Sequence, residues 1–155
     1  TYVRAGAAEL GITGRDVLDE QADSAVYHLA DLGFGRCRMV LAARDGDDSL
    51  ERSLRRLGFM RIATKYSRSA RRYFQATGRQ VELIEVKGSV ELAPLTGLVE
   101  GIVDLTATGT TLRENGLVIR EEIAASTARL IANPVAHKLK AAAIDDVVAR
   151  IRGTA

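Results

Sequence analysis

Short runs of apolar residues alternate along this chain with stretches whose apolar residues recur at helical spacing, and this alternation restricts the fold more than any other feature. Residues 37–43 (CRMVLAA), which are apolar apart from Arg38, read as a strand of the buried, parallel type, and residues 101–105 (GIVDL) form another strand candidate. Between them, Leu50, Leu54 and Leu57 fall on one side of a predicted helix. The alternation predicts an α/β layer fold with a largely parallel sheet.

The segments near the two ends of the chain are assigned from the same kind of pattern. We predict a helix over residues 1–9, a short strand over residues 10–14 and a helix that begins at Arg15. Residues 124–131 read as a helix, which has to end or bend before Pro134.

Composition and charge exclude several classes of function. The 155 residues are 46% hydrophobic and 27% charged, as in an ordinary globular protein. Lys and Arg number 22 against 20 Asp and Glu, and the resulting net charge of +2 argues against a nucleic-acid partner, which usually needs a strongly basic face. The longest purely apolar run, residues 39–43, is too short to cross a membrane. We therefore expect neither a nucleic acid nor a membrane as a partner.

Cysteine and histidine usage points to a reducing compartment and to no protein-held metal. Cys37 is the only cysteine, which fits the cytoplasm, and its place in an apolar run favours a small core residue over a nucleophile. His28 and His137 have no ligand partners at metal-binding spacing. Because the chain opens with Thr1 rather than Met, we expect a further segment to precede it.

The segment IVDLTATGTTL, residues 102–112, carries the strongest functional signal. A buried strand reaches an acid, Asp104, and a loop of small hydroxyl residues follows around Gly109. The backbone N–H groups of such a loop can form an anion nest, its glycine can adopt a positive φ, and its threonine hydroxyls can donate hydrogen bonds to a phosphate. A helical turn beginning near Thr111 would add the positive end of its dipole. The alternative is an ordinary strand-to-helix connection, and spacing alone leaves both readings open.

Several motifs in this chain, taken in order, resemble those of the ATP phosphoribosyltransferase family. That family's signature has a glutamate six residues before a glycine, then a strand ending in Val-Asp, then a Thr-Gly-x-Thr-Leu loop. The matching stretches here are Glu91–Gly97, Gly101–Asp104 and Thr108–Leu112. Weaker matches follow the family in the same order, at residues 11–16, 32–38, 61–66, 88–91, 113–117 and 128–133. The resemblance covers nearly the whole chain.

The resemblance implies a glycosyltransferase that condenses ATP with phosphoribosyl pyrophosphate to give phosphoribosyl-ATP and pyrophosphate, the first step of histidine biosynthesis. A ring nitrogen of adenine would displace pyrophosphate at the anomeric carbon, where oxocarbenium character makes positioning and charge stabilisation more important than a strong base. Glu91 and Asp104 would be the catalytic residues, with Asp104 on the ribose hydroxyls and Glu91 facing the ribose or its Mg²⁺. Phosphoribosyl pyrophosphate would be bound by one loop: Asp104, Thr108, Gly109, Thr110, Thr111 and Leu112.

The other implied contacts concern the nucleotide, the pyrophosphate and the metal. Gly14, Arg15 and Asp16 would form the opposing wall near the nucleotide or the pyrophosphate, and Lys65 would neutralise a phosphate. Mg²⁺ is the implied cofactor, held mainly through the substrate pyrophosphate because this ion keeps most of its waters. A simpler reading of Glu91, as a helix-capping acid, also stays open.

The same resemblance implies two lobes of the periplasmic-binding-protein type (type II) with a cleft between them. On that basis the first lobe takes residues 1–40 and 125–155, and the second takes residues 41–124 with the phosphoribosyl loop. The family's opening strand and Lys-Gly-Arg loop have no counterpart here, and the chain resembles the short form of the enzyme. Short-form members work with a regulatory subunit similar to histidyl-tRNA synthetase, so we expect both a homo-oligomer and a hetero-oligomer.

Two other functions remain open at this point. A non-catalytic solute-binding protein would share the lobed fold, and tight binding of an amino acid or anion without turnover would favour it. A purine-salvage type phosphoribosyltransferase would use a similar loop, but that group commonly shows two consecutive acids before it, and here Leu105 follows Asp104. Selectivity for adenine over guanine or hypoxanthine would distinguish the two enzymes.

Overall fold

The computed structural model describes residues 1–21 and 25–152, which form two compact units. Unit 1 comprises residues 1–36 and 126–155, and unit 2 comprises residues 37–125. The first boundary lies after residue 36 rather than after residue 40, because the strand that begins at Cys37 belongs wholly to unit 2. Residues 22–24 and 153–155, which the sequence assigns to the first lobe, lie outside the described residues. In the described part of the chain, no helix has both the length and the apolar character needed to cross a membrane.

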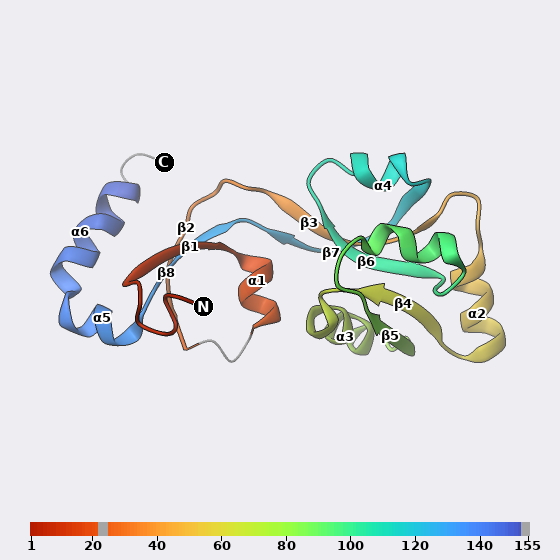
Figure 1. Ribbon diagram of the computed structural model, residues 1–155, viewed down its shortest axis with the longest axis horizontal. Coiled ribbons are helices and arrows are strands. Elements are labelled where there is room, and N and C mark those ends of the chain that lie inside the picture. The colour runs from red at the N-terminus through yellow and green to blue at the C-terminus, as the bar shows by residue number, and fades with distance from the viewer. Residues whose placement is uncertain (22–24, 153–155) are drawn as a thin grey trace. The chain divides into compact units, whose positions relative to one another are not determined.

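Unit 1 is built on a three-stranded antiparallel sheet with the order β1-β8-β2 (Figure 1). The strands are β1 (Leu10–Gly14), β2 (Tyr27–Asp31) and β8 (Ala128–Ala132), and the helices are α1 (Arg15–Glu20), α5 (Pro134–Leu139) and α6 (Ala141–Arg152). Val3, Leu18 and Ile131 form its buried apolar cluster. Asn133 caps the start of α5 by accepting hydrogen bonds from the amides of Val135 and Ala136. Pro134 occupies the first helical position, where a proline is tolerated because its missing N–H would have no partner in the helix.

Two of the predicted helices are wrong. Residues 1–9 form turns, since Gly6 has a φ of 77° and the Ala7 amide reaches back to the Tyr2 carbonyl. Residues 128–131 of the helix expected over 124–131 belong to β8, the central strand of the unit 1 sheet. A short apolar run buried on both sides does not distinguish a strand from a helix by its pattern alone.

Unit 2 contains a five-stranded mixed sheet with the order β5-β4-β6-β3-β7. Its strands are β3 (Cys37–Arg44), β4 (Met60–Thr64), β5 (Val81–Glu85), β6 (Gly101–Thr106) and β7 (Leu117–Ser126), whose last residue falls in unit 1. Its helices are α2 (Ser49–Leu57), α3 (Ser67–Ala76), the 3₁₀ helix η1 (Val90–Thr96) and α4 (Thr110–Glu114).

The two faces of this sheet are covered by different elements (Figure 1). Met39, Leu41 and Ala43 of β3 join the apolar cluster that contains residues of α2 and α3. Val40 and Ala42 join the cluster that contains residues of η1 and α4. Burial on both faces therefore accounts for the continuous apolar run of β3.

The parallel pairing predicted from the sequence holds for β4 with β5 and with β6. It is wrong for β3, which pairs with β6 in the antiparallel direction. A run of apolar residues indicates that both faces of a strand are buried. Both faces of β3 are buried although it pairs with β6 in the antiparallel direction. Because β4 and β6 are parallel, with Thr64 opposite Val103, their carboxyl ends lie at the same edge of the sheet.

Candidate active site

Lys65 and Asp104 meet at this edge of the unit 2 sheet. Lys65 follows the last residue of β4, and Asp104 is the fourth residue of β6. The Lys65 Nζ lies 3.6 Å from the Asp104 Oδ1, which also accepts a hydrogen bond of 2.8 Å from the Leu105 amide. The Asp104 side chain is only 13% exposed, whereas that of Lys65 is 44% exposed. The lysine expected to neutralise a phosphate thus has a carboxylate beside it in this structure.

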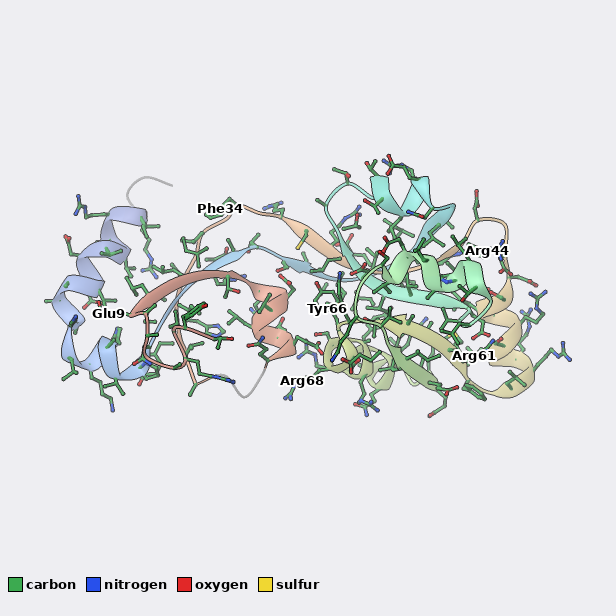
Figure 2. The ribbon with its side chains drawn as sticks, in the orientation of Figure 1. Glu9, Phe34, Arg44, Arg61, Tyr66 and Arg68 are labelled. Atoms are coloured by element: carbon green, nitrogen blue, oxygen red, sulfur yellow. The ribbon has the colours of Figure 1, made fainter. Side chains whose placement is uncertain are left out.

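Thr64 fixes the turn that carries Lys65, and the sequence analysis missed it. Its fully buried hydroxyl donates to the Val103 carbonyl at 2.7 Å and accepts from the Tyr66 amide at 2.9 Å. Lys65 is therefore held between two anchored residues, of which Tyr66 is labelled in Figure 2. The available signal was a hydroxyl residue at the end of a strand, directly before Lys65.

The surroundings of Asp104 shift the pKa of its carboxyl in both directions. Burial raises the pKa of this carboxyl above its ordinary value and outweighs the opposing effects of the Leu105 amide and Lys65. The negative charge of Glu91 raises the pKa of Asp104 further, which places two acids in one electrostatic environment. Glu91 is half-buried on η1, in the first turn of that helix. An acid in the first turn of a helix interacts favourably with the helix dipole, and the helix-capping interpretation of Glu91 stays a prediction.

The loop between β6 and α4 is held by its own threonines. The Gly109 amide donates to the Thr106 hydroxyl at 2.7 Å, and the Thr110 amide donates to the Thr108 hydroxyl at 3.3 Å. The hydroxyls of Thr108 and Thr110 are 2.9 Å apart. Two of the amides expected to form an anion nest are thus bound within the loop, and a phosphate would have to replace these bonds.

Gly109 is required by the shape of the loop. It has a φ of 76°, in the left-handed region that side chains disfavour, and it caps the N-terminus of α4. A Cβ at this position would approach the Arg113 Nη1 to 3.2 Å. Leu112 is buried and anchors α4 to the sheet, whereas Thr108, Thr110 and Thr111 are exposed and accessible to a ligand.

The second group of predicted site residues lies in unit 1, where β1 runs directly into α1. The Ser126 hydroxyl accepts a hydrogen bond from the Asp16 amide at 3.0 Å and donates one to the Asp16 Oδ1 at 2.8 Å. A Cβ on Gly14 would meet the Asp16 carboxylate, so a larger residue there would require that side chain to move. Arg15 pairs with Asp19 at 2.9 Å, and 46% of its side chain is exposed.

The predicted residues therefore divide between the two units. Unit 2 brings together Lys65, Glu91, Asp104 and residues 108–112, and unit 1 holds residues 14–16. The partners Thr64 and Ser126 were missed because each acts through a contact between segments distant in sequence.

With this geometry established, the comparisons with known proteins identify the family. The model of the ATP phosphoribosyltransferase (HisG) family matches residues 1–153. The chain belongs to the ATP phosphoribosyltransferase family. The ATP phosphoribosyltransferase of Rubrobacter xylanophilus is 56% identical to it over 151 residues, which cover 97% of this chain and 69% of the relative. The family resemblance of the sequence is confirmed.

Solved structures agree with this family assignment. The ATP phosphoribosyl transferase (HisG:HisZ) complex from Thermotoga maritima matches with a TM-score of 0.82 and 36% identity, covering 98% of this chain and 72% of that chain. The periplasmic aliphatic sulphonate binding protein SsuA from Escherichia coli matches with a TM-score of 0.65 and 15% identity, covering 97% of this chain and 56% of its own. The second likeness concerns the fold alone, and the predicted α/β fold of the periplasmic-binding-protein type is confirmed.

For this member of the family, the donor groups fit a metal that is bound through substrate. Within residues 1–21 and 25–152, no group of three or more His, Cys, Asp or Glu side chains could hold a metal ion. Mg²⁺ commonly takes one or two carboxylates and completes its shell with substrate phosphates and water. Glu91 and Asp104 are two carboxylates of unit 2 whose charges act on each other. His137 instead packs edge-on against Tyr27, with ring centroids 5.4 Å apart.

Proposed function

We propose that this chain condenses ATP with phosphoribosyl pyrophosphate to form phosphoribosyl-ATP and pyrophosphate, the first step of histidine biosynthesis. The observation that carries the proposal is the position of Asp104 near the end of β6, the strand that leads into a threonine-rich loop, in a chain whose family model matches residues 1–153. The purine-salvage alternative is not favoured, because the relatives are named ATP phosphoribosyltransferase at 46–56% identity.

In this reaction one bond forms and one breaks at the anomeric carbon of the ribose. A ring nitrogen of adenine supplies the electron pair for the new C–N bond, and the C–O bond to pyrophosphate breaks with its electrons leaving on the pyrophosphate. The ribose passes through a state with oxocarbenium character, which is stabilised by fixed negative charge and by correct orientation of the two substrates.

The residues of unit 2 suit the phosphoribosyl half of the reaction. Asp104, whose charged form is favoured by Lys65 and the Leu105 amide against the effect of burial, would accept hydrogen bonds from the ribose hydroxyls. The exposed hydroxyls of Thr108 and Thr110 would exchange the bond between them for bonds to the 5′-phosphate, and the exposed Thr111 hydroxyl would donate to the same group. Leu112 and Gly109 would set the loop's position and shape. Glu91 would face the ribose or its metal.

Lys65 and the residues of unit 1 are assigned to the charged leaving group and the nucleotide. The exposed Arg15 and the neighbouring Gly14 and Asp16 would contact the nucleotide or the pyrophosphate. Lys65 would neutralise a phosphate in addition to holding Asp104 ionised. Mg²⁺ would be held mainly by the pyrophosphate and would supply charge neutralisation to that leaving group.

We also propose partners and a location for the enzyme. The Thermotoga maritima relative was solved as a HisG:HisZ complex. By analogy, this chain would form a homo-oligomer and bind a regulatory subunit similar to histidyl-tRNA synthetase. As a biosynthetic enzyme using ATP, it would act in the cytoplasm.

The proposal is tested by following ultraviolet absorbance with ATP, phosphoribosyl pyrophosphate, Mg²⁺ and inorganic pyrophosphatase, with and without the regulatory subunit. We expect a signal that requires both substrates. Thr111→Val should lower kcat/KM for phosphoribosyl pyrophosphate by about 10-fold or more, because a hydrogen bond to a charged group is lost.

Thr77→Val is the matched control, since the Thr77 hydroxyl bonds only backbone carbonyls and the Arg79 side chain at the end of α3. Equal activity of the two variants would overturn the assignment of the loop. No turnover in either setting, with tight binding of an amino acid or anion, would overturn the enzyme and favour a solute-binding protein.

A further inference from the structure

The phosphate loop has a guanidinium packed against it that no assignment above includes. Arg113, on α4, donates from Nη1 to the Thr108 carbonyl at 3.0 Å and from Nη2 to the Thr110 hydroxyl at 3.1 Å. We propose that Arg113 is a further substrate-binding residue. It positions the loop and brings its positive charge next to the phosphomonoester of the substrate. This inference rests on the proposed function.

The close approach of Arg113 depends on the glycine of the loop. A Cβ at Gly109 would lie 3.2 Å from the Arg113 Nη1, so glycine leaves room for the guanidinium as well as permitting the positive φ. Arg113 spans the loop from residue 108 to residue 110, on either side of that glycine. The guanidinium therefore packs against Gly109 and hydrogen-bonds the loop on both sides of it.

A phosphomonoester bound at the loop would need a nearby positive charge. A phosphomonoester carries between one and two negative charges near neutral pH, and the acids of this site, Asp104 and Glu91, would repel it. α4 has only five residues, so its dipole offers little positive charge. Lys65 lies beside Asp104 and is assigned to a phosphate of the leaving group rather than to the phosphomonoester. Both hydrogen bonds of Arg113 go to uncharged oxygens, which leave its charge available for the phosphate.

Arg113 also explains how the loop can keep its shape when a phosphate arrives. Binding requires the hydroxyls of Thr108 and Thr110 to give up the bonds that now hold the loop amides and each other. The bond from Arg113 to the Thr108 carbonyl involves no hydroxyl and can persist through that exchange. The exposed guanidinium has five N–H donors, which are enough to hydrogen-bond the loop and a phosphate at the same time.

The test measures binding of ribose 5-phosphate by calorimetry, and separately the KM values for phosphoribosyl pyrophosphate and ATP. Arg113→Gln should weaken ribose 5-phosphate binding by about 10- to 100-fold, the loss expected for one charge-assisted hydrogen-bonding group. The KM for phosphoribosyl pyrophosphate should rise by a similar factor while the KM for ATP stays near wild type. Arg113→Lys should recover part of the affinity, because it keeps the charge but not the planar fork.

Arg120→Gln is the matched control. Arg120 is also exposed, also in unit 2, and also donates to backbone carbonyls, those of Arg44 and Asp47. If Arg113→Gln binds ribose 5-phosphate as tightly as Arg120→Gln does, the inference is wrong. A parallel rise of both KM values would likewise assign Arg113 a merely structural role and overturn it.

The outcomes also separate this inference from the proposed function. Loss of ribose 5-phosphate binding in Thr111→Val with normal binding in Arg113→Gln would leave the proposed function standing and reject Arg113 alone. Absence of ribose 5-phosphate binding and of turnover in the wild-type protein would reject both.

Discussion

At the scale of single residues, Asp104 has a proposed role in the site, and its ionised form lowers the stability of the folded protein because the carboxyl is buried. Burial raises the pKa of its carboxyl in the folded protein above the ordinary value of 3.8. The native state therefore holds this proton more tightly than the unfolded chain does. Stability falls as the pH rises from the unfolded pKa through the folded pKa, and the full cost is present above the folded pKa.

Asp104→Asn should separate these two effects. The amide keeps an acceptor for the Leu105 N–H but carries no charge, so we expect thermal stability at neutral pH to match or exceed that of the wild type. Catalytic activity should fall by at least about 100-fold, as when one preorganised charge-stabilising group is removed. The stability difference should vanish as the pH falls below 3.8, where both proteins carry a neutral side chain.

Thermal unfolding across this pH range, together with the absorbance assay, provides the measurement. An Asn variant that retains wild-type turnover would remove Asp104 from the proposed reaction. A variant whose instability at neutral pH exceeds that in acid would contradict the sign of the pKa shift.

The residues named from the strand-and-loop motif could be predicted because they are neighbours in sequence. Asp104 and Thr108–Thr111 are joined by the β6–α4 connection, and no long-range contact is needed to group them. The contacts of Lys65 with Asp104 and of Ser126 with Asp16 could not be predicted. They depend on strand register in unit 2 and on a pairing across 110 sequence positions in unit 1.

At the scale of elements, β4 and β6 are fixed to each other at both ends. At the start, the buried Glu100 accepts hydrogen bonds from the Arg61 amide at 2.6 Å and from the Arg61 guanidinium, and the Glu100 amide donates to the Arg61 carbonyl (Arg61 is labelled in Figure 2). At the other end, Thr64 bonds Val103. These two links set the register that places Lys65 beside Asp104.

Glu100→Gln should weaken this link and with it the sheet. Burial opposes ionisation of Glu100, but the hydrogen bonds and charge of Arg61 outweigh it and lower the pKa of the carboxyl. This stabilisation is present above the unfolded pKa and is lost as the pH falls through the folded pKa. We expect the free energy of unfolding to fall by about 1–3 kcal/mol at neutral pH, discounted because the Arg61 side chain is 40% exposed.

Urea unfolding at several pH values tests this expectation. Glu122→Gln is a suitable control, since Glu122 pairs with Arg38 at 3.2 Å where both side chains are well exposed, and its loss should change stability little. Equal effects of the two substitutions, or a Glu100→Gln difference that grows toward acid pH, would contradict the account of this pair.

The elements themselves were only partly predictable. Strands β3 and β6 follow from apolar runs, but nothing in such a run indicates the direction of the neighbouring strand, and β3 is antiparallel to β6. The strand β8 was taken for a helix because burial on both sides erases the alternation that identifies a strand.

At the scale of the whole molecule, family membership comes from the order of many weak motifs. No single short match is specific, yet together they span the chain, and the family model matches residues 1–153. The proposed site residues divide between the two units, residues 14–16 in unit 1 and the others in unit 2. Each unit has its own apolar core, and the reaction proposed here draws on residues supported by each.

Mass spectrometry of the reaction product tests the central claim most directly. After incubation with ATP, phosphoribosyl pyrophosphate and Mg²⁺, we expect a product that contains intact ATP joined to one phosphoribosyl group, with one pyrophosphate released per product. Unchanged ATP beside hydrolysed phosphoribosyl pyrophosphate, or a nucleotide lengthened by pyrophosphate, would contradict condensation at the anomeric carbon.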